Sequence, residues 1–400
     1  MQEIHVSLAV RNGKAFIGGS FVSKDILLAG GKIAKIGTNL KGDENVDASG
    51  MLVLPGLIDP HVHLREPGDT YKEDFTTGSR AAIAGGFTTV IDMPNNKIPT
   101  ITAGRLKEKE KLAKNASCDV LFHFGGTDTN FDEVRTANPH SLKLYLGKTT
   151  GELMLRDPSS MQRHFAAFPK DRPVVLHACG HETDEAKGLE QTHSNIEAAL
   201  SAARALGRRV HIAHVSTESE ILLAKKYSGC TVEVAPHHLF LSKKDMARLG
   251  PYGRVYPALR SEQKRIKLWS ALHLANCIAA DHAPHTIEDK EAGAAGFPGL
   301  ETSLALMLDA CGKGLLGLPW VVRAMSDNVA KTFNLPDRGR LEAGCRGDVT
   351  IADQKAAWKV DGSELQTKCR WSPFDGMRLK GKVESVIRDG KIVYEEGQFF

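Results

Sequence analysis

The sequence predicts an α/β protein built on a (β/α)8 barrel of the TIM type, with a small β-sandwich-like domain beside it. Two observations carry this prediction. Eight apolar runs alternate with amphipathic stretches through the middle of the chain, and short strands separated by Gly-rich turns occur at both ends. The length of 400 residues suits this combination, because such a barrel alone commonly takes about 250 residues.

The two ends of the chain resemble each other more than either resembles the middle. Near the N-terminus, SLAVRNGKAFIGG and DILLAGGKIAKIG place Gly-rich turns between apolar alternations. Near the C-terminus, DVTIAD and VESVIRDGKIVYEEGQ have the same texture, with RDGK as a predicted hairpin turn. We therefore expect residues 1–50 and 340–400 to meet in one small β domain, with the barrel formed by residues 51–339.

Eight strand–helix units are expected in the middle of the chain. Stretches such as AGRLKEKEKLAKN and NIEAALSAARALGRR carry apolar residues at helical spacing. Units in this order are the pattern of a parallel barrel. The expected strands are the apolar runs MLVLPGLID, TTVIDMPN, CDVLFHFGG, SLKLYLG, PVVLHA, RVHIAHV, CTVEVAP and CIAADHAPH.

Composition narrows the class of protein. The 52 basic and 48 acidic residues leave a net charge of only +4, and aromatic residues make up 6%, which argues against nucleic acid as the main partner. The seven cysteines are scattered without a CxxC pair, as is usual in a reducing compartment. The N-terminal sequence has no signal-peptide pattern, and no apolar run approaches about 18 residues. We expect a cytoplasmic protein that does not span a membrane.

Nearly every apolar run ends in polar or ionisable residues. In a barrel of this kind the carboxyl ends of the strands face a single active-site mouth, so residues more than 200 positions apart should converge there. The residues concerned are His61, His63, Asn95, Lys143, His177, His214, Glu233 and Asp281.

Several of these residues are suited to metal binding. His61 and His63 are separated by one residue, so on a strand both imidazoles point to the same face and can reach one ion. His177 and His214 follow apolar runs at successive strand ends, although each alone could be a hydrogen-bonded core histidine. Asp281 follows three apolar residues and needs a cation or a donor if it is buried, a helix N-cap being the alternative.

Lys143 is the least obvious candidate. It alternates with leucines along its strand, so its ammonium could point into the barrel, where it needs partners or a lowered pKa. A neutral lysine can react with carbon dioxide to give a carbamate, whose two oxygens could bridge two metal ions. The alternative is a lysine exposed at a strand edge.

Longer motifs resemble the dihydroorotases of the amidohydrolase superfamily. DPHVHLREPG at 59–68, KEDFTTGSRAAIAGGFTTV at 72–90 and DMPNN at 92–96 carry the resemblance, followed in order by SLKLYL, HIAHVST, EVAPHHLFLS, AADHAPHT and GFPGLET. The resemblance covers most of residues 50–335. It implies a zinc-dependent hydrolase that reversibly cyclises N-carbamoyl-L-aspartate to L-dihydroorotate in de novo pyrimidine (UMP) biosynthesis.

The resemblance also implies two zinc ions per chain, bridged by a carboxylated Lys143 and a hydroxide. Asp281 would be the catalytic proton shuttle between that hydroxide and the leaving ring nitrogen. The implied ligands are His61, His63 and Asp281 for the more buried ion, and His177 and His214 for the more exposed one.

Substrate recognition is implied at a further set of positions. Arg65, Asn95 and His285 would bind the substrate carboxylate, and the backbone at Ala283 and Gly299 would hold the ring. Thr149 lies in GKTTGEL (147–153), which resembles a loop that closes over substrate.

Arg65 is the residue that discriminates most sharply between substrates. Its guanidinium can grip a carboxylate in bidentate fashion, whereas hydantoinases, dihydropyrimidinases and allantoinases act on rings without this carboxylate and should differ here. A surface salt bridge from Arg65 to Glu66 or Asp69 is the alternative. The chain differs from the family pattern at Cys179, two residues after His177, where an acidic residue is common.

The sequence also allows other interpretations. Glu233 and His238 could bind an additional metal or support the site, and we favour support. The chain could be another cyclic amidase, or a barrel that has lost activity and serves as a scaffold, although every expected ligand is present. We expect a small-molecule substrate and a homodimer, and leave open an association with an aspartate carbamoyltransferase.

Overall fold

A closed parallel barrel forms the centre of the molecule. The computed structural model describes residues 6–147, 151–180 and 184–400. A bridge between Val62 and His282 joins the last strand to the first, and the His63 amide donates to the His282 carbonyl at 2.7 Å. The predicted (β/α)8 fold class is confirmed. The strands, in their order around the barrel, are β8 (Leu57–Val62), β9 (Phe87–Asp92), β10 (Asp119–Gly125), β11 (Ser141–Tyr145), β12 (Val174–His177), β13 (Val210–Ile212), β14 (Cys230–Val234) and β15 (Cys277–Ile278).

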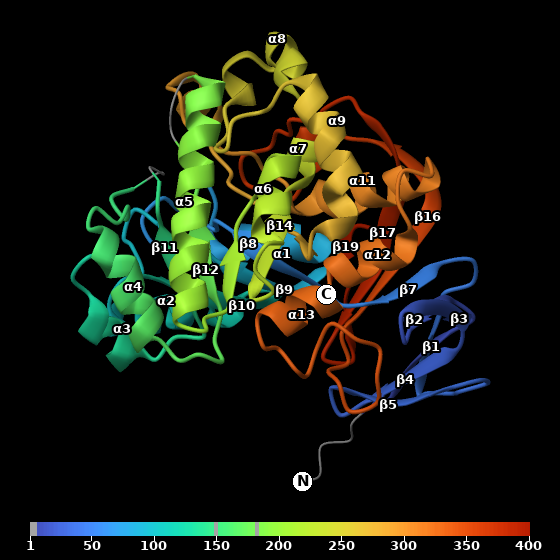
Figure 1. Ribbon diagram of the computed structural model, residues 1–400. Coiled ribbons are helices and arrows are strands. Elements are labelled where there is room, and N and C mark those ends of the chain that lie inside the picture. The colour runs from blue at the N-terminus through green and yellow to red at the C-terminus, as the bar shows by residue number, and fades with distance from the viewer. Residues whose placement is uncertain (1–5, 148–150, 181–183) are drawn as a thin grey trace.

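Helices surround these strands (Figure 1). Several begin where the sequence supplies a side-chain cap: Asp74 and Thr77 form a capping box at α1, and Thr217 and Glu220 form one at α6. The α-helices are α1 (Phe75–Ala84), α2 (Ala103–Leu112), α3 (Phe131–Ala137), α4 (Pro158–Ala167), α5 (Glu185–Ala205), α6 (Glu218–Ala224), α7 (Pro236–Phe240), α8 (Met246–Leu249), α9 (Glu262–Ala271), α10 (Ile287–Glu291), α11 (Leu300–Gly312), α12 (Leu318–Ala324) and α13 (Asp327–Thr332). Short 3-10 turns are η1 (Ala113–Asn115), η2 (Lys243–Asp245), η3 (Gly250–Gly253), η4 (Leu272–Leu274) and η5 (Gly362–Glu364).

The ends of the chain form two further sheets, and strands from both ends meet in the larger one. The N-terminal strands β1 to β5 are seen at the lower right of Figure 1. The four-stranded sheet has the order β5-β4-β1-β6, and the seven-stranded sheet has the order β19-β18-β17-β16-β7-β2-β3. The strands are β1 (Leu8–Arg11), β2 (Lys14–Ile17), β3 (Ser20–Ser23), β4 (Asp25–Ala29), β5 (Lys32–Gly37), β6 (Glu44–Asp47), β7 (Leu52–Pro55), β16 (Val349–Lys359), β17 (Arg378–Arg388), β18 (Lys391–Glu395) and β19 (Gln398–Phe399).

The pairing of β7 with β16 joins the two chain ends. These strands run antiparallel, with Val349 opposite Pro55. Strand β7 therefore belongs to the outer sheet, and the chain enters the barrel after it, at β8. Side chains of both sheets, such as Ile26 and Ile351, pack in one apolar cluster between them. The hairpin predicted at RDGK joins β17 to β18, and both Asp389 and Gly390 have positive φ there. The division of the chain into a terminal β domain, residues 1–50 with 340–400, and a barrel domain, residues 51–339, stays our proposal.

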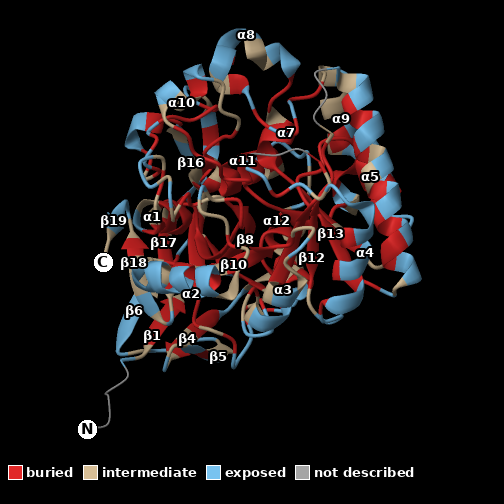
Figure 2. Cartoon of the chain, turned by 90° about the vertical axis from the view of Figure 1, so that its left-hand side faces the viewer, coloured by how far each residue is buried: buried red, intermediate tan, exposed pale blue. Residues whose placement is uncertain are grey.

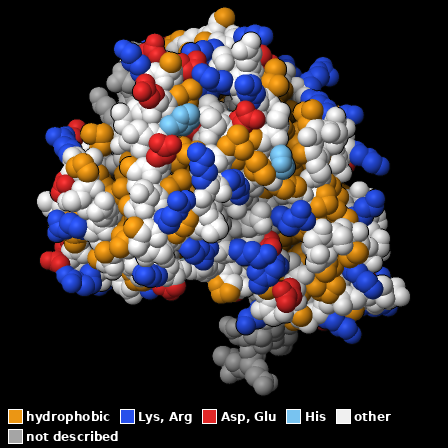
Figure 3. Space-filling view, in the orientation of Figure 1, with side chains coloured by type: hydrophobic (Ala, Val, Ile, Leu, Met, Phe, Trp, Pro, Cys, Tyr) orange, Lys and Arg blue, Asp and Glu red, His pale blue; other side chains and the backbone are white. Residues whose placement is uncertain are grey.

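Burial follows the layers of the fold. Buried residues fill the barrel and the space beneath the helices, whose outer faces are exposed (Figure 2). Basic side chains are spread over the face seen in Figure 3, with acidic residues between them. Among the helices in the described ranges, none is long and apolar enough to cross a membrane.

Candidate metal centre and active site

Polar side chains at the carboxyl ends of the barrel strands converge on one small cavity. The strand order brings them together, because β8 and β15 are neighbours in the closed barrel although about 220 residues separate them. An outer cavity of about 510 Å³ shares His63, Arg65 and Asn95 with it. The inner cavity is lined, among others, by His61, His63, Arg65, Asn95, Lys143, Tyr145, His177, His214, Asp281 and Ala283.

His61, His63 and Asp281 form a group with metal-ligand geometry. The Nε2 atoms of both histidines lie 3.2 Å from Asp281 Oδ1, and the three ligand atoms fall within 4.8 Å of one another. Burial lowers the pKa of His63 to about 3, so its imidazole is neutral at neutral pH. Although burial opposes ionisation of Asp281, the nearby His61 and His63 lower its pKa to about 2. A neutral imidazole and an ionised carboxylate are the forms of these side chains that bind a divalent cation.

His177 and His214 form a second pair beside the first. His177 Nδ1 lies 2.8 Å from His214 Nε2, and the rings of His61 and His214 are 5.2 Å apart. Burial, followed by the charge that His177 would carry, lowers the pKa of His214 well below its usual value. Two imidazoles that share a single proton at this distance are suited to hold one cation in its place.

Lys143 lines the same cavity and is fully buried. Its Nζ has no hydrogen-bond partner among the described residues and lies 5.5 Å from the centre of the Tyr145 ring. Burial lowers the pKa of this amine to about 8, although the carboxylates of Glu233 and Asp281 oppose the shift. A buried amine without a partner is costly, and a neutral one is nucleophilic.

Glu233 lies behind the first histidine pair rather than in the cavity. One carboxylate oxygen contacts His61 Nδ1 closely and accepts the His214 amide at 3.2 Å, and the other lies 2.9 Å from His211 Nε2. Although burial opposes ionisation, His61 and His211 hold the pKa of Glu233 well below its usual range. Because Glu233 engages Nδ1, the Nε2 atom of His61 is directed at Asp281. The His238 ring packs on His237, and its two nitrogens have no hydrogen-bond partner within the described residues.

Arg65 lies at the junction of the two cavities. Its side chain is 7% exposed, Nε donates to the Pro284 carbonyl at 3.0 Å, and a terminal nitrogen lies 3.0 Å from His285 Nε2. Strand β8 ends before it, and Arg65 has a φ of 64°. Among the described residues, no ion pair joins it to Glu66 or Asp69.

The remaining predicted substrate residues are placed unequally. Asn95 and His285 line the outer cavity together with Arg65. Ala283 lines the inner cavity, and its amide donates to the Phe297 carbonyl at 2.7 Å. Gly299 caps α11, and its amide donates to His282 Nδ1 at 3.1 Å. Thr149 lies outside the described residues.

Comparison with known proteins identifies the family. The amidohydrolase family model matches residues 52–393. The chain belongs to the amidohydrolase family. It is 38% identical over 401 residues to a dihydroorotase of Pyrococcus furiosus, covering 97% of this chain and 93% of that protein. It is 36% identical to the multifunctional protein CAD of Squalus acanthias, over 89% of this chain and 15% of that protein.

Solved structures carry the same fold. The L-hydantoinase (dihydropyrimidinase) of Arthrobacter aurescens superposes with a TM-score of 0.94 at 28% identity, over 99% of this chain and 97% of that one. The resemblance to an amidohydrolase that the sequence motifs indicated is therefore confirmed.

The residues of this amidohydrolase fit the metal dependence of its family. Two histidine pairs, a carboxylate and the buried amine of Lys143, which has no hydrogen-bond partner in the described ranges, surround one cavity. Nitrogen and oxygen donors of this kind suit zinc and similar divalent ions. If the amine of Lys143 were converted to a carbamate, a metal between these groups would be the counter-ion of that buried anion.

Sequence reasoning missed several residues that hold this amidohydrolase site in place. Asp59 accepts the amides of His61 and Ala280, and Asp92 accepts the Leu64 amide and pairs with the buried Lys109 at 2.5 Å. Asp59 and Asp92 stand within the DPHVH and DMPNN motifs, but nothing in their spacing indicates that they bind backbone amides elsewhere.

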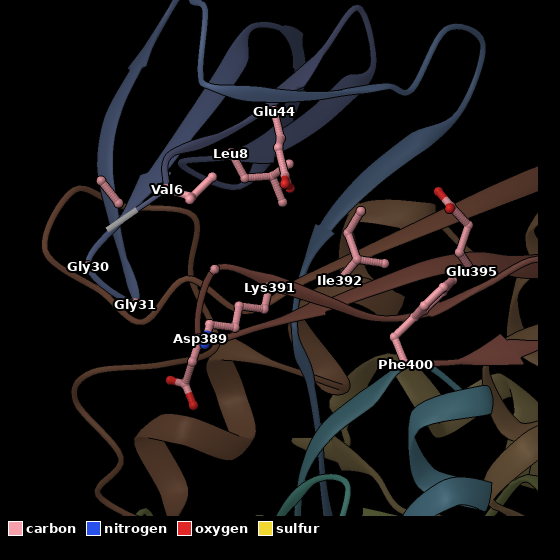
Figure 4. Close-up of a pocket in the computed structure, with 12 residues that line it drawn as sticks. Val6, Leu8, Gly30, Gly31, Glu44, Asp389, Lys391, Ile392, Glu395 and Phe400 are labelled. Atoms are coloured by element: carbon pink, nitrogen blue, oxygen red, sulfur yellow. The ribbon is translucent and has the colours of Figure 1, made fainter. Parts of the chain in front are cut away.

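A larger hollow of about 670 Å³ lies far from these histidines, between the four-stranded sheet and the C-terminal hairpin (Figure 4). Apolar side chains such as Leu8, Ile392 and Phe400 line it, together with Glu44 and Glu395. It offers no cluster of metal-binding nitrogens among the described residues.

Proposed function

We propose that this amidohydrolase is a dihydroorotase, which interconverts N-carbamoyl-L-aspartate and L-dihydroorotate in de novo pyrimidine (UMP) biosynthesis. The observation that carries the proposal is the buried Arg65 guanidinium beside the His61–His63–Asp281 group. Dihydroorotate bears a ring carboxylate that a guanidinium can bind through two parallel hydrogen bonds. The relatives named dihydroorotase at 38% identity support the same substrate.

We propose that the site takes two zinc ions. His61, His63 and Asp281 would hold one, His177 and His214 the other, with a carboxylated Lys143 between them. Zinc bound there would lower the pKa of a water molecule and polarise the carbonyl group under attack. The buried amine at Lys143, with its pKa near 8, supports carboxylation because a sizeable neutral fraction is available to react with carbon dioxide.

Asp281 is the proposed catalytic acid and base. Its pKa of about 2 in the protein without metal keeps the carboxylate ionised at neutral pH, so it can accept the proton of the attacking water. As the ring amide breaks, the same carboxyl group passes that proton to the leaving nitrogen. In cyclisation Asp281 takes a proton from the attacking ureido nitrogen and returns it to the departing oxygen.

Arg65, His285 and Asn95 are the proposed carboxylate-binding residues. They line the outer cavity beside His63, so a substrate carboxylate held there would keep the ring amide over the metal ligands. His285 Nε2 lies 3.0 Å from a terminal nitrogen of Arg65 and 3.1 Å from the Ala295 carbonyl oxygen. Ala283 would contact the ring, and Thr149 and Gly299 stay predictions from the family resemblance.

A second candidate function is hydrolysis of a ring without a carboxylate. The observation in its favour is the L-hydantoinase structure, which shares the fold and 28% of the sequence with this chain. The buried Arg65 argues against it, because an uncharged ring would leave the guanidinium without a counter-ion.

We further propose a homodimer in the cytoplasm, with the small-molecule substrate as its ligand and neither nucleic acid nor membrane as a partner. The match to a segment of a multifunctional protein supports an association with another enzyme, for which an aspartate carbamoyltransferase is our proposal.

The deciding experiment measures hydrolysis of L-dihydroorotate by the purified protein beside dihydrouracil, hydantoin and allantoin, with metal content determined on the same sample. Turnover of dihydroorotate alone, with about two zinc ions per chain, is the expected result. Turnover of an uncharged ring instead would overturn the substrate. A full metal content without any turnover would favour the scaffold alternative.

A further inference from the structure

We propose that Lys290 is a positioning residue that fixes the substrate-facing wall of the site by clamping two loops together. Lys290 lies in α10, is fully buried and donates from Nζ to the Arg254 carbonyl at 2.7 Å and the Gly296 carbonyl at 3.0 Å. Within the described residues its ammonium has no carboxylate partner. The rings of Phe297 and Trp371 lie 5.4 and 5.6 Å from it instead.

The two clamped loops both line the inner cavity. Arg254 precedes Val255 and Tyr256, which line one side, and Gly296 lines the other with Ala295. The Arg254 carbonyl also accepts the Gly296 amide at 3.0 Å, so one oxygen receives both the ammonium and the facing loop. Segments about 40 residues apart thus meet at a single buried cation.

Gly296 transmits this position to the carboxylate-binding residues. Its φ is 145°, and a Cβ there would lie 2.5 Å from the Ala283 carbonyl oxygen and 3.2 Å from the His285 ring. His285 Nε2 in turn accepts from the Arg65 guanidinium at 3.0 Å, and the His285 carbonyl accepts the Trp371 indole at 2.8 Å. A shift of Gly296 would therefore move His285, and with it the guanidinium.

The chemistry of the clamp favours a positioning role over a general stabilising one. Burial without a counter-ion is unfavourable for an ammonium, and it lowers the pKa of Lys290 to about 7. An apolar side chain of similar volume would fill such a space at lower cost. Carbonyl dipoles and aromatic faces compensate the cation only in one arrangement of the two loops.

The test replaces Lys290 by methionine, which keeps an unbranched apolar side chain and removes the donors. Because the inference rests on the proposed function, the first readout is steady-state hydrolysis of L-dihydroorotate. We expect KM to rise about 10-fold, with kcat changed less than threefold and metal content unchanged. Lys290→Gln, which keeps an N–H donor, should fall between Lys290→Met and the unaltered protein, and it serves alone if Lys290→Met fails to fold.

Arg208→Met is the matched control. Arg208 is another fully buried cation bound to backbone carbonyls, those of Phe168 at 2.6 Å and Arg172 at 3.1 Å, but these lie away from both cavities. Its replacement should destabilise the fold and leave KM unchanged. An equal rise in KM in both variants, or an unchanged KM in both Lys290 variants, would overturn the proposal.

Hydrogen–deuterium exchange separates this inference from the proposed function. Amides of 251–257 and 293–299 should exchange faster in Lys290→Met and not in Arg208→Met, whichever ring the enzyme hydrolyses. Unchanged exchange in both segments would refute the clamp, whereas failure to turn over dihydroorotate with faster exchange would refute only the substrate.

Discussion

At the scale of single residues, three of the candidate functional side chains stand on strained backbone. Arg65, His214 and Asp281 have φ values of 64°, 38° and 46°, in the left-handed region that L-residues rarely occupy. Each such conformation costs on the order of 1–3 kcal/mol and persists only where surrounding contacts enforce it. All three follow the end of a barrel strand, where the chain must turn sharply to direct a side chain back over the mouth.

Arg65 determines the substrate if the proposed function holds. Arg65→Met removes charge-assisted hydrogen bonds worth about 1.5–3 kcal/mol, which corresponds to a rise of about 10- to 150-fold in KM for dihydroorotate. Two metal ions should stay bound, because Arg65 contacts no ligand of the His61–His63–Asp281 group. Steady-state kinetics beside metal analysis checks this. Kinetics unchanged from the parent protein would disprove the assignment.

Carboxylation of Lys143 predicts a pH dependence of activation. Burial lowers its pKa from 10.5 to about 8, so the nucleophilic neutral amine becomes the major form as pH rises through about 8. Activity recovered from metal-free protein, zinc and bicarbonate should therefore appear faster with increasing pH, with a midpoint near 8. Lys143→Ala is the control and should bind less metal at every pH. Recovery that is independent of pH and of bicarbonate would contradict the carbamate.

At the scale of the elements, Asp59 joins the first and last strands of the barrel. Its two carboxylate oxygens accept the amides of His61 in β8, at 2.9 Å, and of Ala280 just after β15, at 2.8 Å. Burial raises the pKa of Asp59 well above its usual range. Ionisation of Asp59 as the pH rises therefore lowers the free energy of unfolding. Its role in the fold is to accept the two buried amides.

Asp59→Ala tests this junction. Two buried N–H groups would lose their acceptor, at about 1–3 kcal/mol each, so we expect a clearly lower free energy of unfolding and weaker metal binding at His61. Asp59→Asn keeps one acceptor and should lose less. Chemical denaturation together with zinc competition against a chelator measures both effects. Equal stability of Asp59→Ala and the parent would show that the junction does not depend on this side chain.

At the scale of the whole molecule, an ion-pair cluster beneath the barrel ties the C-terminal segment to it. Asp119, the first residue of β10, pairs with Arg338, Arg346 and Arg388 at 2.9, 3.0 and 2.6 Å. The strand ends that carry the metal ligands lie at the opposite end of the barrel. A change in this cluster should therefore alter the stability of the fold without altering catalysis.

Asp119→Asn leaves three arginines around an uncharged amide. We expect the free energy of unfolding to fall by about 1–3 kcal/mol, with kcat and KM for dihydroorotate unchanged. Denaturant unfolding and steady-state kinetics on the same preparation check this. A matching loss of activity would mean that the C-terminal sheet influences the mouth.

Local patterns were enough to predict the architecture. Each of the eight apolar runs overlaps one of the strands β8 to β15, but the first run, MLVLPGLID, also contains β7, which belongs to the outer sheet. The Asp-Gly hairpin and the Gly-rich terminal strands lie where their composition predicted them. Alternation and helical spacing depend on neighbouring residues, so they are legible in one sequence. The same patterns predicted which polar residues converge, because the carboxyl ends of all strands in this fold lie around one mouth. These residues are His61, His63, Lys143, His177, His214 and Asp281.

Contacts between distant segments depended on the tertiary structure. Arg65 meets Pro284 across 219 residues, Glu233 meets His61 across 172, and Lys290 joins Arg254 to Gly296. The pairing of β7 with β16, which places β7 in the outer sheet, is of the same kind. The sequence by itself determined which residues stand at the mouth of the barrel. The partners that orient those residues were decided by packing, because a buried side chain bonds to whatever the folded chain brings within about 3 Å, however far away it lies in sequence.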